Sequence, residues 1–320
     1  MKKSIALVLA LVMVVALCAC GGSKAEATKI TYATGGTSGT YYGFSGVIAN
    51  VLNEKLADTL NISVQSTGSS KANIQMLDAK ECNLAIVQND VMYYANTGTD
   101  LFAGEKPITS FSAVCSCYPE YVQIVAKKGI TSVAQLAGKN VSVGDAGSGT
   151  EFNARQILAA YGLTFDDINV SNQSFADSCD SLKNGTIDAA FVVAGYPTTA
   201  VTELATSYDF SLVAVDDEHV ADLQKDYGFY FYGAIPGGTY SCVAEDVPAV
   251  AVMATIVASN DLSEDVVYAF VKGLFDYKAD ITAAHVKGAE LDLDTAVSGV
   301  SIPWHPGAAK YFAEQGKTVG

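Results

Sequence analysis

The chain has very few histidines, tryptophans and arginines. Its 320 residues include three histidines, one tryptophan and a single arginine, Arg155. The seven cysteines contain no CxxC pair, and the histidines lie far apart in the sequence. A His/Cys metal site is therefore not expected, and we predict neither a metal nor a cofactor.

The motifs of common enzyme families are also missing. Gly144 and Gly149 have the spacing of a phosphate-binding loop, but Thr150 stands where that loop needs lysine. No serine lies in a GxSxG nucleophile elbow, and neither HExxH nor an EF-hand pattern occurs. The sequence thus predicts a protein that is not an enzyme and has no catalytic residue.

Positive charge is scarce as well. The chain has 19 Lys and Arg against 34 Asp and Glu, a formal net charge of −15 at pH 7. So acidic a surface argues against nucleic acid and against anionic lipid as partners. A small anionic ligand stays open, because a few nearby N–H groups outweigh distant, screened charge. Half of the residues are hydrophobic, and the length suffices for two domains.

The N-terminus has the pattern of an export signal. A basic start precedes an apolar run over 5–17, which is too short for a comfortable membrane span. The run ends in LCAC at Cys20, which matches a bacterial lipobox. We predict a lipoprotein signal peptide over 1–19, a lipid anchor on Cys20 and a tether over 20–28. A plain secretory peptide with incidental cysteines is the alternative.

Two similar strand–loop–helix units organise the chain, at 30–56 and 140–161. Their glycine-rich loops are GGTSGTYY at 35–42 and GDAGSGT at 144–150. Glycine lets the backbone come close to a ligand, and a helix N-terminus offers free N–H groups at the positive end of its dipole. The pair predicts two lobes that close on one small acidic ligand.

The order of the remaining elements supports two βα lobes. Strands alternate with helices in both halves, which predicts parallel sheets with the ligand at the carboxyl ends of the strands. Apolar runs at 121–127 and 250–259 are expected to cross between the lobes as hinge strands. Lobe one would then comprise 29–123 plus 251–320, and lobe two 124–250.

Candidate ligand contacts lie in the two loops and at strand ends. They are Thr37, Ser38, Thr40, Tyr41, Gln88, Asp90, Ser148, Thr150, Asn153 and Tyr196. The hydroxyls and amides suit a carboxylate, and Tyr196 would form an aromatic wall. Helix capping alone is the alternative for the loop residues. Asp90 would hold a ligand ammonium or cap a helix, and Tyr42 is the alternative to Tyr41.

Arg155 has the planar fork that suits a carboxylate, although it lies a full turn from the loop. A surface pair with Glu151, four residues earlier, is the alternative.

Five motifs in order resemble one family. They are GGTSGTYYG at 35–43, NLAIVQND at 83–90, GSGTEFNARQIL at 147–158, AGYPTTAV at 194–201 and IPWHPGAAKYF at 302–312. Together with the lipobox, they resemble the TAXI-type extracytoplasmic solute receptors of tripartite (TRAP) transporters over essentially all of the mature chain.

The resemblance implies an α/β, two-lobed periplasmic-binding-protein fold of type II-like form. It implies a lipid-anchored monomer at the outer face of the cytoplasmic membrane. Such a receptor captures a small carboxylate, a glutamate-like amino acid or a dicarboxylate, and hands it to the membrane permease subunits of an ion-gradient-driven TRAP transporter. The alternatives are the receptor of an ATP-driven importer, a receptor for an aromatic or thiamine-precursor ligand, a sensory module and, less favoured, a secreted enzyme.

Overall fold

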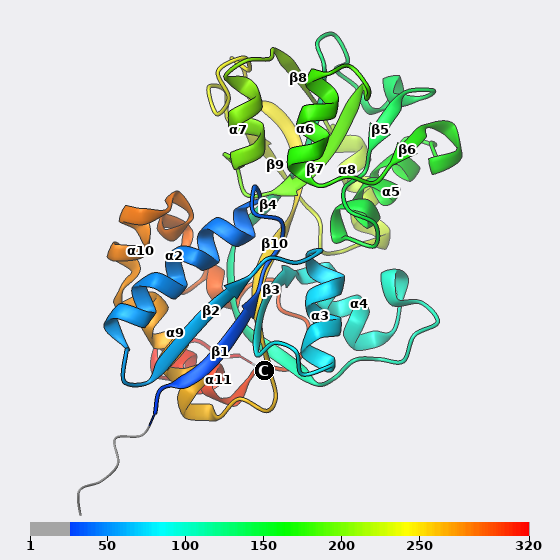
Figure 1. Ribbon diagram of the computed structural model, residues 1–320. Coiled ribbons are helices and arrows are strands. Elements are labelled where there is room, and N and C mark those ends of the chain that lie inside the picture. Colours follow the sequence, from blue (N-terminus) through cyan, green and yellow to red (C-terminus); the bar gives the residue numbers. More distant parts are fainter. Residues whose placement is uncertain (1–25, 320) are drawn as a thin grey trace, which may run out of the picture.

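The computed structural model describes residues 26–319. Figure 1 shows two lobes stacked along a narrow waist. The predicted signal peptide, Cys20 and most of the predicted tether lie outside the described residues. Within 26–319, no helix combines the length and the apolar character needed to cross a bilayer.

The first lobe is built on three parallel strands. β1 (Thr28–Ala33) pairs with β2 (Leu60–Gln65) on one side and with β3 (Leu84–Gln88) on the other. The connections are α2 (Thr40–Lys55) and α3 (Ser70–Asp78). Both helices therefore begin at the carboxyl ends of these strands, as the alternation of strands and helices predicts.

The second lobe repeats this arrangement. β5 (Asn140–Ser142) pairs in parallel with β6 (Asn169–Ser171) and with β7 (Ala189–Ala194). α5 (Gly149–Ala160) and α6 (Phe175–Lys183) connect them. The N-termini of these two helices consequently face the first lobe (Figure 1).

Two long strands run through both lobes. β4 (Phe111–Lys127) and β10 (Val247–Ser259) pair antiparallel to each other. Antiparallel pairing also joins β10 to β3 and β4 to β7, so one continuous sheet runs β2-β1-β3-β10-β4-β7-β5-β6. The two apolar runs do form crossing strands. The expectation of parallel sheets holds only for the outer strands, because the crossing strands run against their neighbours.

Short strands and helices complete the fold. They are α4 (Asn89–Thr97), α7 (Thr199–Ala205), β8 (Phe210–Val213), α8 (Asp217–Asp226), β9 (Phe231–Ile235), α9 (Glu264–Asp276), α10 (Lys278–Ala284) and α11 (Pro306–Glu314). After β10 the chain returns to the first lobe, where α9 and α11 pack on each other.

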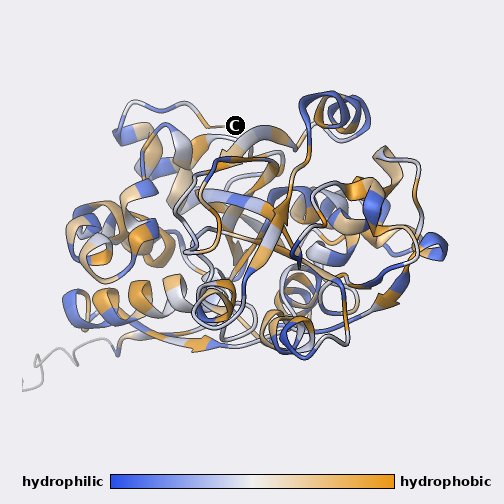
Figure 2. Cartoon of the chain, turned by 90° about the horizontal axis from the view of Figure 1, so that it is seen from above, coloured by the Kyte–Doolittle hydropathy of each residue, from blue (hydrophilic) through white to orange (hydrophobic). Residues whose placement is uncertain are grey.

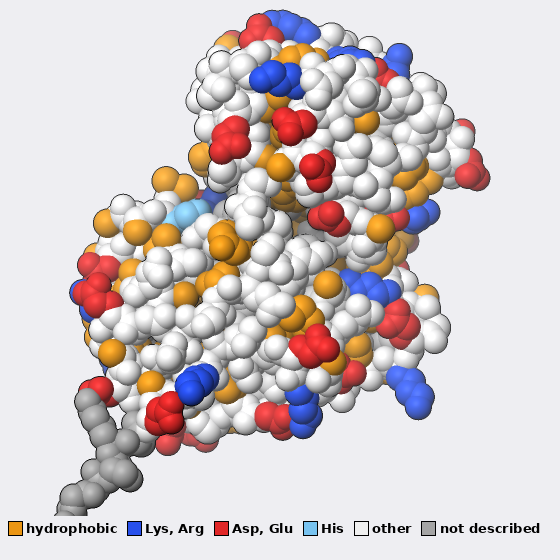
Figure 3. Space-filling view, viewed as in Figure 1, with side chains coloured by type: hydrophobic (Ala, Val, Ile, Leu, Met, Phe, Trp, Pro, Cys, Tyr) orange, Lys and Arg blue, Asp and Glu red, His pale blue; other side chains and the backbone are white. Residues whose placement is uncertain are grey.

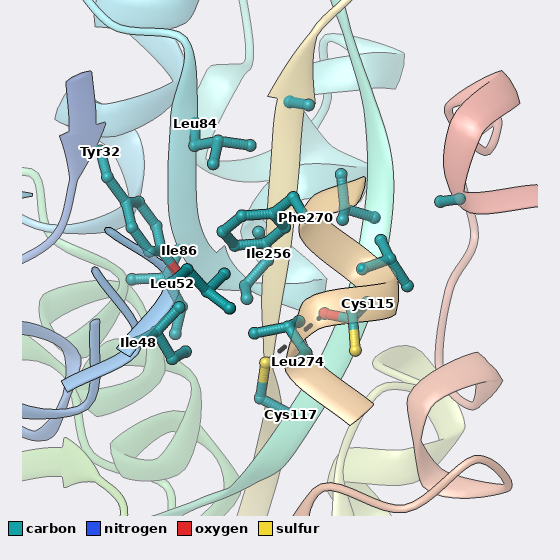
Figure 4. Close-up of a cluster of buried hydrophobic side chains, with 14 of the residues drawn as sticks. Tyr32, Ile48, Leu52, Leu84, Ile86, Cys115, Cys117, Ile256, Phe270 and Leu274 are labelled. Atoms are coloured by element: carbon teal, nitrogen blue, oxygen red, sulfur yellow. Dashed lines mark hydrogen bonds between the residues drawn. The ribbon is translucent and has the colours of Figure 1, made fainter. Parts of the chain in front are cut away.

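Each lobe has its own apolar core. In the first, Tyr32 packs edge-on to Phe270 beside Ile48, Leu84 and Ile256 (Figure 4). The second lobe has a separate core that includes buried residues of β7 and α5. The helices carry both hydrophilic and hydrophobic segments (Figure 2), as expected when one face of a helix covers a core. The predicted lobe boundaries fall inside β4 and β10 and stay predictions.

Cys115 and Cys117 are fully buried in the first core, where they act as small hydrophobic residues. Cys82, Cys179 and Cys242 are unpaired too, so no disulfide joins any part of 26–319.

Candidate ligand site between the lobes

A cavity lies between the lobes where helix N-termini from both sides converge. The first lobe lines it with the loop before α2, with Ser69 and with Glu120. The second lobe contributes Asp145, Ser148 and Ser174, among other residues. The cavity volume is about 40 Å³, well below the several hundred Å³ of typical ligand sites. The lobes are therefore nearly closed in this structure, although the surface is still indented between them (Figure 3).

The helix ends at the cavity differ in capping. The Ser148 hydroxyl accepts a hydrogen bond from the Glu151 N–H of α5, and Ser174 caps α6 in the same way. No side-chain cap is present on α2 or α3. The first-turn N–H groups of α2 and α3 are thus available to an acceptor on a ligand.

The second glycine-rich loop depends on Gly144. Its φ is +89°, and a Cβ on this residue would lie 2.8 Å from Cγ2 of Thr150. Only glycine allows this tight turn, which places Thr150 at the cavity.

Five of the predicted contacts line the cavity: Ser38, Thr40, Tyr41, Ser148 and Thr150. The Thr40 hydroxyl donates to the Gly195 carbonyl oxygen of the opposite lobe at 2.8 Å. Tyr41, rather than Tyr42, faces the cavity. Contact of these residues with a ligand stays a prediction.

The other five lie elsewhere. Thr37 is exposed, and Tyr196 packs against the Tyr121 ring with centroids 5.0 Å apart. Gln88, Asp90 and Asn153 are buried, but they hydrogen-bond to one another across the lobes and do not line the cavity. Their ligand contacts also stay predictions. In the closed structure these side chains form hydrogen bonds between the lobes.

Arg155 forms the surface pair with Glu151 that was predicted as the alternative to ligand binding. Its guanidinium lies 3.6 Å from the Glu151 carboxylate and 4.0 Å above the Phe165 ring. The side chain is half exposed, and it is absent from the residues that line the cavity.

Glu120 also lines the cavity, although it is not among the ten predicted contacts; the sequence indicated only that it precedes the first crossing strand and could line the hinge. It is only 2% exposed, and its Oε2 accepts a hydrogen bond from the Tyr41 hydroxyl at 2.6 Å. Burial raises its pKa well above the ordinary value, while the Tyr41 hydrogen bond and the Lys287 charge act in the opposite direction. The available signal was an acid inside a long apolar strand. An acid within a strand does not reveal which surface of the lobe it faces. The sequence alone therefore did not select Glu120 as a ligand contact.

Asp145 is the second carboxyl group at the cavity, and burial raises its pKa as well. The described residues that line the cavity include no Lys, Arg or His. The site therefore offers backbone N–H groups and hydroxyls to an anionic group, and carboxyl groups to a donor.

The fold and this interlobe cavity define a two-lobed α/β protein of the periplasmic-binding-protein type. Solved structures agree in fold. One from Bordetella bronchiseptica RB50 has a TM-score of 0.52 at 17% identity and covers 90% of this chain and 83% of that one. The alkanesulfonate-binding protein SsuA from Xanthomonas axonopodis pv. citri, bound to MOPS, has a TM-score of 0.50 at 16% identity, covering 90% and 84%. A putative L-cystine ABC transporter from Listeria monocytogenes has a TM-score of 0.50 at 15% identity, covering 83% and 97%.

The family follows from the sequence match. A family model described as the NMT1-like family matches residues 32–316, which is most of the chain. This protein belongs to the NMT1-like family.

Proposed function

We propose that this protein is an extracytoplasmic solute-binding receptor that captures a small carboxylate between its lobes and delivers it to a membrane transporter. The observation that carries the proposal is the cavity at which the N-termini of α2, α3, α5 and α6 meet. Closure around an anion at helix N-termini needs no catalytic residue.

The ligand class follows from the polar groups of the cavity. Uncapped N–H groups and the Thr150 hydroxyl suit a carboxylate, and Glu120 suits an ammonium group. The Thr40 hydroxyl donates to Gly195 across the lobes and so supports closure around the ligand. A glutamate-like amino acid satisfies both. A dicarboxylate would need Glu120 to be protonated, since two like charges would otherwise face each other in a buried site.

A thermal-shift screen against amino acids, dicarboxylates, oxo acids and sulfonates tests the receptor. A ligand present at a hundred times its Kd adds about 2.7 kcal/mol to the free energy of unfolding. We expect the shift with one acid to be lost in Thr40→Ala and kept in Thr37→Ala, a threonine of the same loop outside the cavity lining. Binding of cationic compounds alone would contradict the ligand class, and turnover of the bound acid would contradict the receptor function.

An ATP-driven importer is the better-supported transporter. One of the structural relatives reported above is a putative ABC transporter. The ion-gradient-driven TRAP permease is the second candidate, which the five ordered sequence motifs favour. Neighbouring genes discriminate the two: an ATPase subunit supports the importer, and a large ion-coupled permease supports TRAP.

The lipobox motif supports the location outside the cytoplasmic membrane. Radiolabelled palmitate should enter the wild-type protein and not a Cys20→Ala variant, which should be released from the membrane. Equal retention of both proteins would exclude the lipid anchor.

A further inference from the structure

A group of buried polar side chains joins the lobes outside the ligand cavity. We call it the polar lock. Its members come from the first lobe and from the second, and each is at most 4% exposed: Gln88, Asp90, Tyr94, Asn153, Gln156 and Tyr230. None of them lines the cavity.

Asn153 is the centre of the lock. Its Nδ2 donates to Oδ2 of Asp90 at 3.0 Å and to the Tyr230 hydroxyl at 2.7 Å, while its Oδ1 accepts from Nε2 of Gln88 at 2.8 Å. Because Gln88 and Asp90 stand at the start of α4 and Asn153 on α5, the bonds of Asn153 to Gln88 and Asp90 exist only when the lobes are together. The bond of Asn153 to Tyr230 lies within the second lobe and holds the Asn153 side chain in place.

The lock continues along the interface. The Tyr230 hydroxyl donates to Oε1 of Gln156 at 2.6 Å, and Nε2 of Gln156 donates to the Tyr94 hydroxyl at 3.3 Å. The Tyr94 ring packs edge-on to Phe152 and Phe229. Buried hydrogen bonds in a chain of this kind reinforce one another, and breaking one leaves polar groups without partners.

Asp90 gives the lock a charge that no neighbour neutralises. Its Oδ1 accepts from the Val91 N–H, and no Lys, Arg or His within 26–319 forms an ion pair with it. The titratable groups that act on it, or on which it acts, are Asp100, Glu120, Tyr94 and Tyr230. Burial raises the pKa of Asp90 to about 6, whereas an Asp exposed by opening has a pKa near 3.9.

We propose that the polar lock is a second closure element, separate from the ligand cavity, which holds the lobes together and takes up a proton at Asp90 as they close. It goes beyond the proposed receptor function, since it acts without ligand. Acid then favours the closed form, because the closed state binds the proton more tightly than the open state.

The experiment measures lobe separation in the purified full-length protein without ligand. Spin labels are attached at Asn50→Cys on α2 and Thr202→Cys on α7, which are exposed positions in opposite lobes, and pulsed electron paramagnetic resonance measures the distance between them. Cys242→Ser removes the most accessible thiol within 26–319. We expect the ratio of closed to open protein to be about tenfold higher at pH 5 than at pH 7.5. The measurement is made with Glu120→Gln in every protein, because Glu120 is a second buried acid between the lobes whose pKa is raised. Addition of Asp90→Asn should then abolish the dependence on pH. Asp166→Asn, an exposed acid outside the lock, should keep it.

The centre of the lock is tested separately. Asn153→Ala should lower the closed population at both pH values. Tyr94→Phe, which removes the hydroxyl that accepts from Gln156 across the lobes and keeps the ring, should lower it about fivefold and serves if Asn153→Ala does not fold. Distances that do not change with pH when only Glu120 is replaced, a pH response that persists when Asp90 is replaced as well, or a Tyr94→Phe protein as closed as the wild type would each overturn the proposal. Because no ligand is used, failure of the lock is distinct from failure of the receptor function.

Discussion

Replacement of Gly149 by alanine should separate folding from ligand capture. Gly149 is the first residue of α5, and in the closed structure a Cβ at this position would lie 1.5 Å from Oε1 of Gln88 and 3.1 Å from Cγ2 of Val91. Both neighbours belong to the opposite lobe. The extra methyl group therefore obstructs closure, and nothing in the lobe of Gly149 itself opposes it.

The substitution should change the free energies of the open and the closed form in opposite directions. In the open form, alanine should stabilise α5 by up to about 1 kcal/mol, because glycine pays more conformational entropy in a helix. In the closed form, Gln88 must leave its place and lose its bond to Asn153, which costs about 1 kcal/mol, and its displaced amide needs new partners at a further cost of about 1–3 kcal/mol. Ligand affinity should fall at least tenfold.

The assay is a pair of measurements on one protein. The melting temperature without ligand should stay equal or rise, and calorimetric titration with the ligand found by the screen should give the weaker Kd. Gly46→Ala is the matched control, because Gly46 lies inside α2 and a Cβ there has no neighbour within 4 Å. Wild-type affinity in Gly149→Ala would refute the view that the lobes must approach this closely to hold the ligand.

Three further changes test the core and the charges. Phe270→Ala should cost about 3–5 kcal/mol in urea unfolding, since it empties a buried position beside Tyr32; a loss under about 1 kcal/mol would contradict the packing. Glu120→Gln should have a higher melting temperature than the wild type at pH 8 but not at pH 4. The reason is that the raised folded-state pKa of Glu120 makes the wild type less stable as the pH rises. Equal melting temperatures at pH 8 would contradict burial of an unneutralised Glu120 carboxylate. Asp188→Asn should cost about 1 kcal/mol at pH 7 and progressively less as the pH falls below the ordinary Asp pKa near 3.9, because the pKa of Asp188 is lowered chiefly by the hydrogen bond from Lys127 and the stabilisation is lost as Asp188 protonates. A cost that is unchanged at low pH would assign the effect to packing.

Local sequence patterns predicted the elements well. The helix expected over 40–56 is α2 (Thr40–Lys55), and the strand expected over 250–259 lies within β10. Apolar periodicity and glycine-rich loops act within a few residues, so a single sequence records them. Five predicted residues of the two loops line the cavity, because a strand–loop–helix unit fixes where its helix begins and hence where the loop lies.

Contacts between the lobes were beyond such reasoning. Gln88 was predicted as a ligand contact because it follows a strand end, and Asn153 because it shares one face of the first helical turn with Thr150, yet in the closed form they bond to each other. Glu120 was expected only as a residue that could line the hinge, because its place at the cavity depends on the course of β4 through both lobes. Polar residues at a strand end or in a first helical turn thus indicate a surface that faces the other lobe. Only the arrangement of the lobes decides whether these residues bind a ligand or a protein side chain.

The return of the chain to the first lobe sets the order in which the molecule can be completed. Strand β10 inserts between β3 and β4, and Trp304 forms a bridge to Ala113, so the first lobe needs the last part of the chain for its sheet and core. Nearly all of the second lobe is synthesised earlier. During synthesis, the second lobe can therefore fold before the first lobe is complete. Until β10 has been synthesised, one edge of β3 has no partner strand.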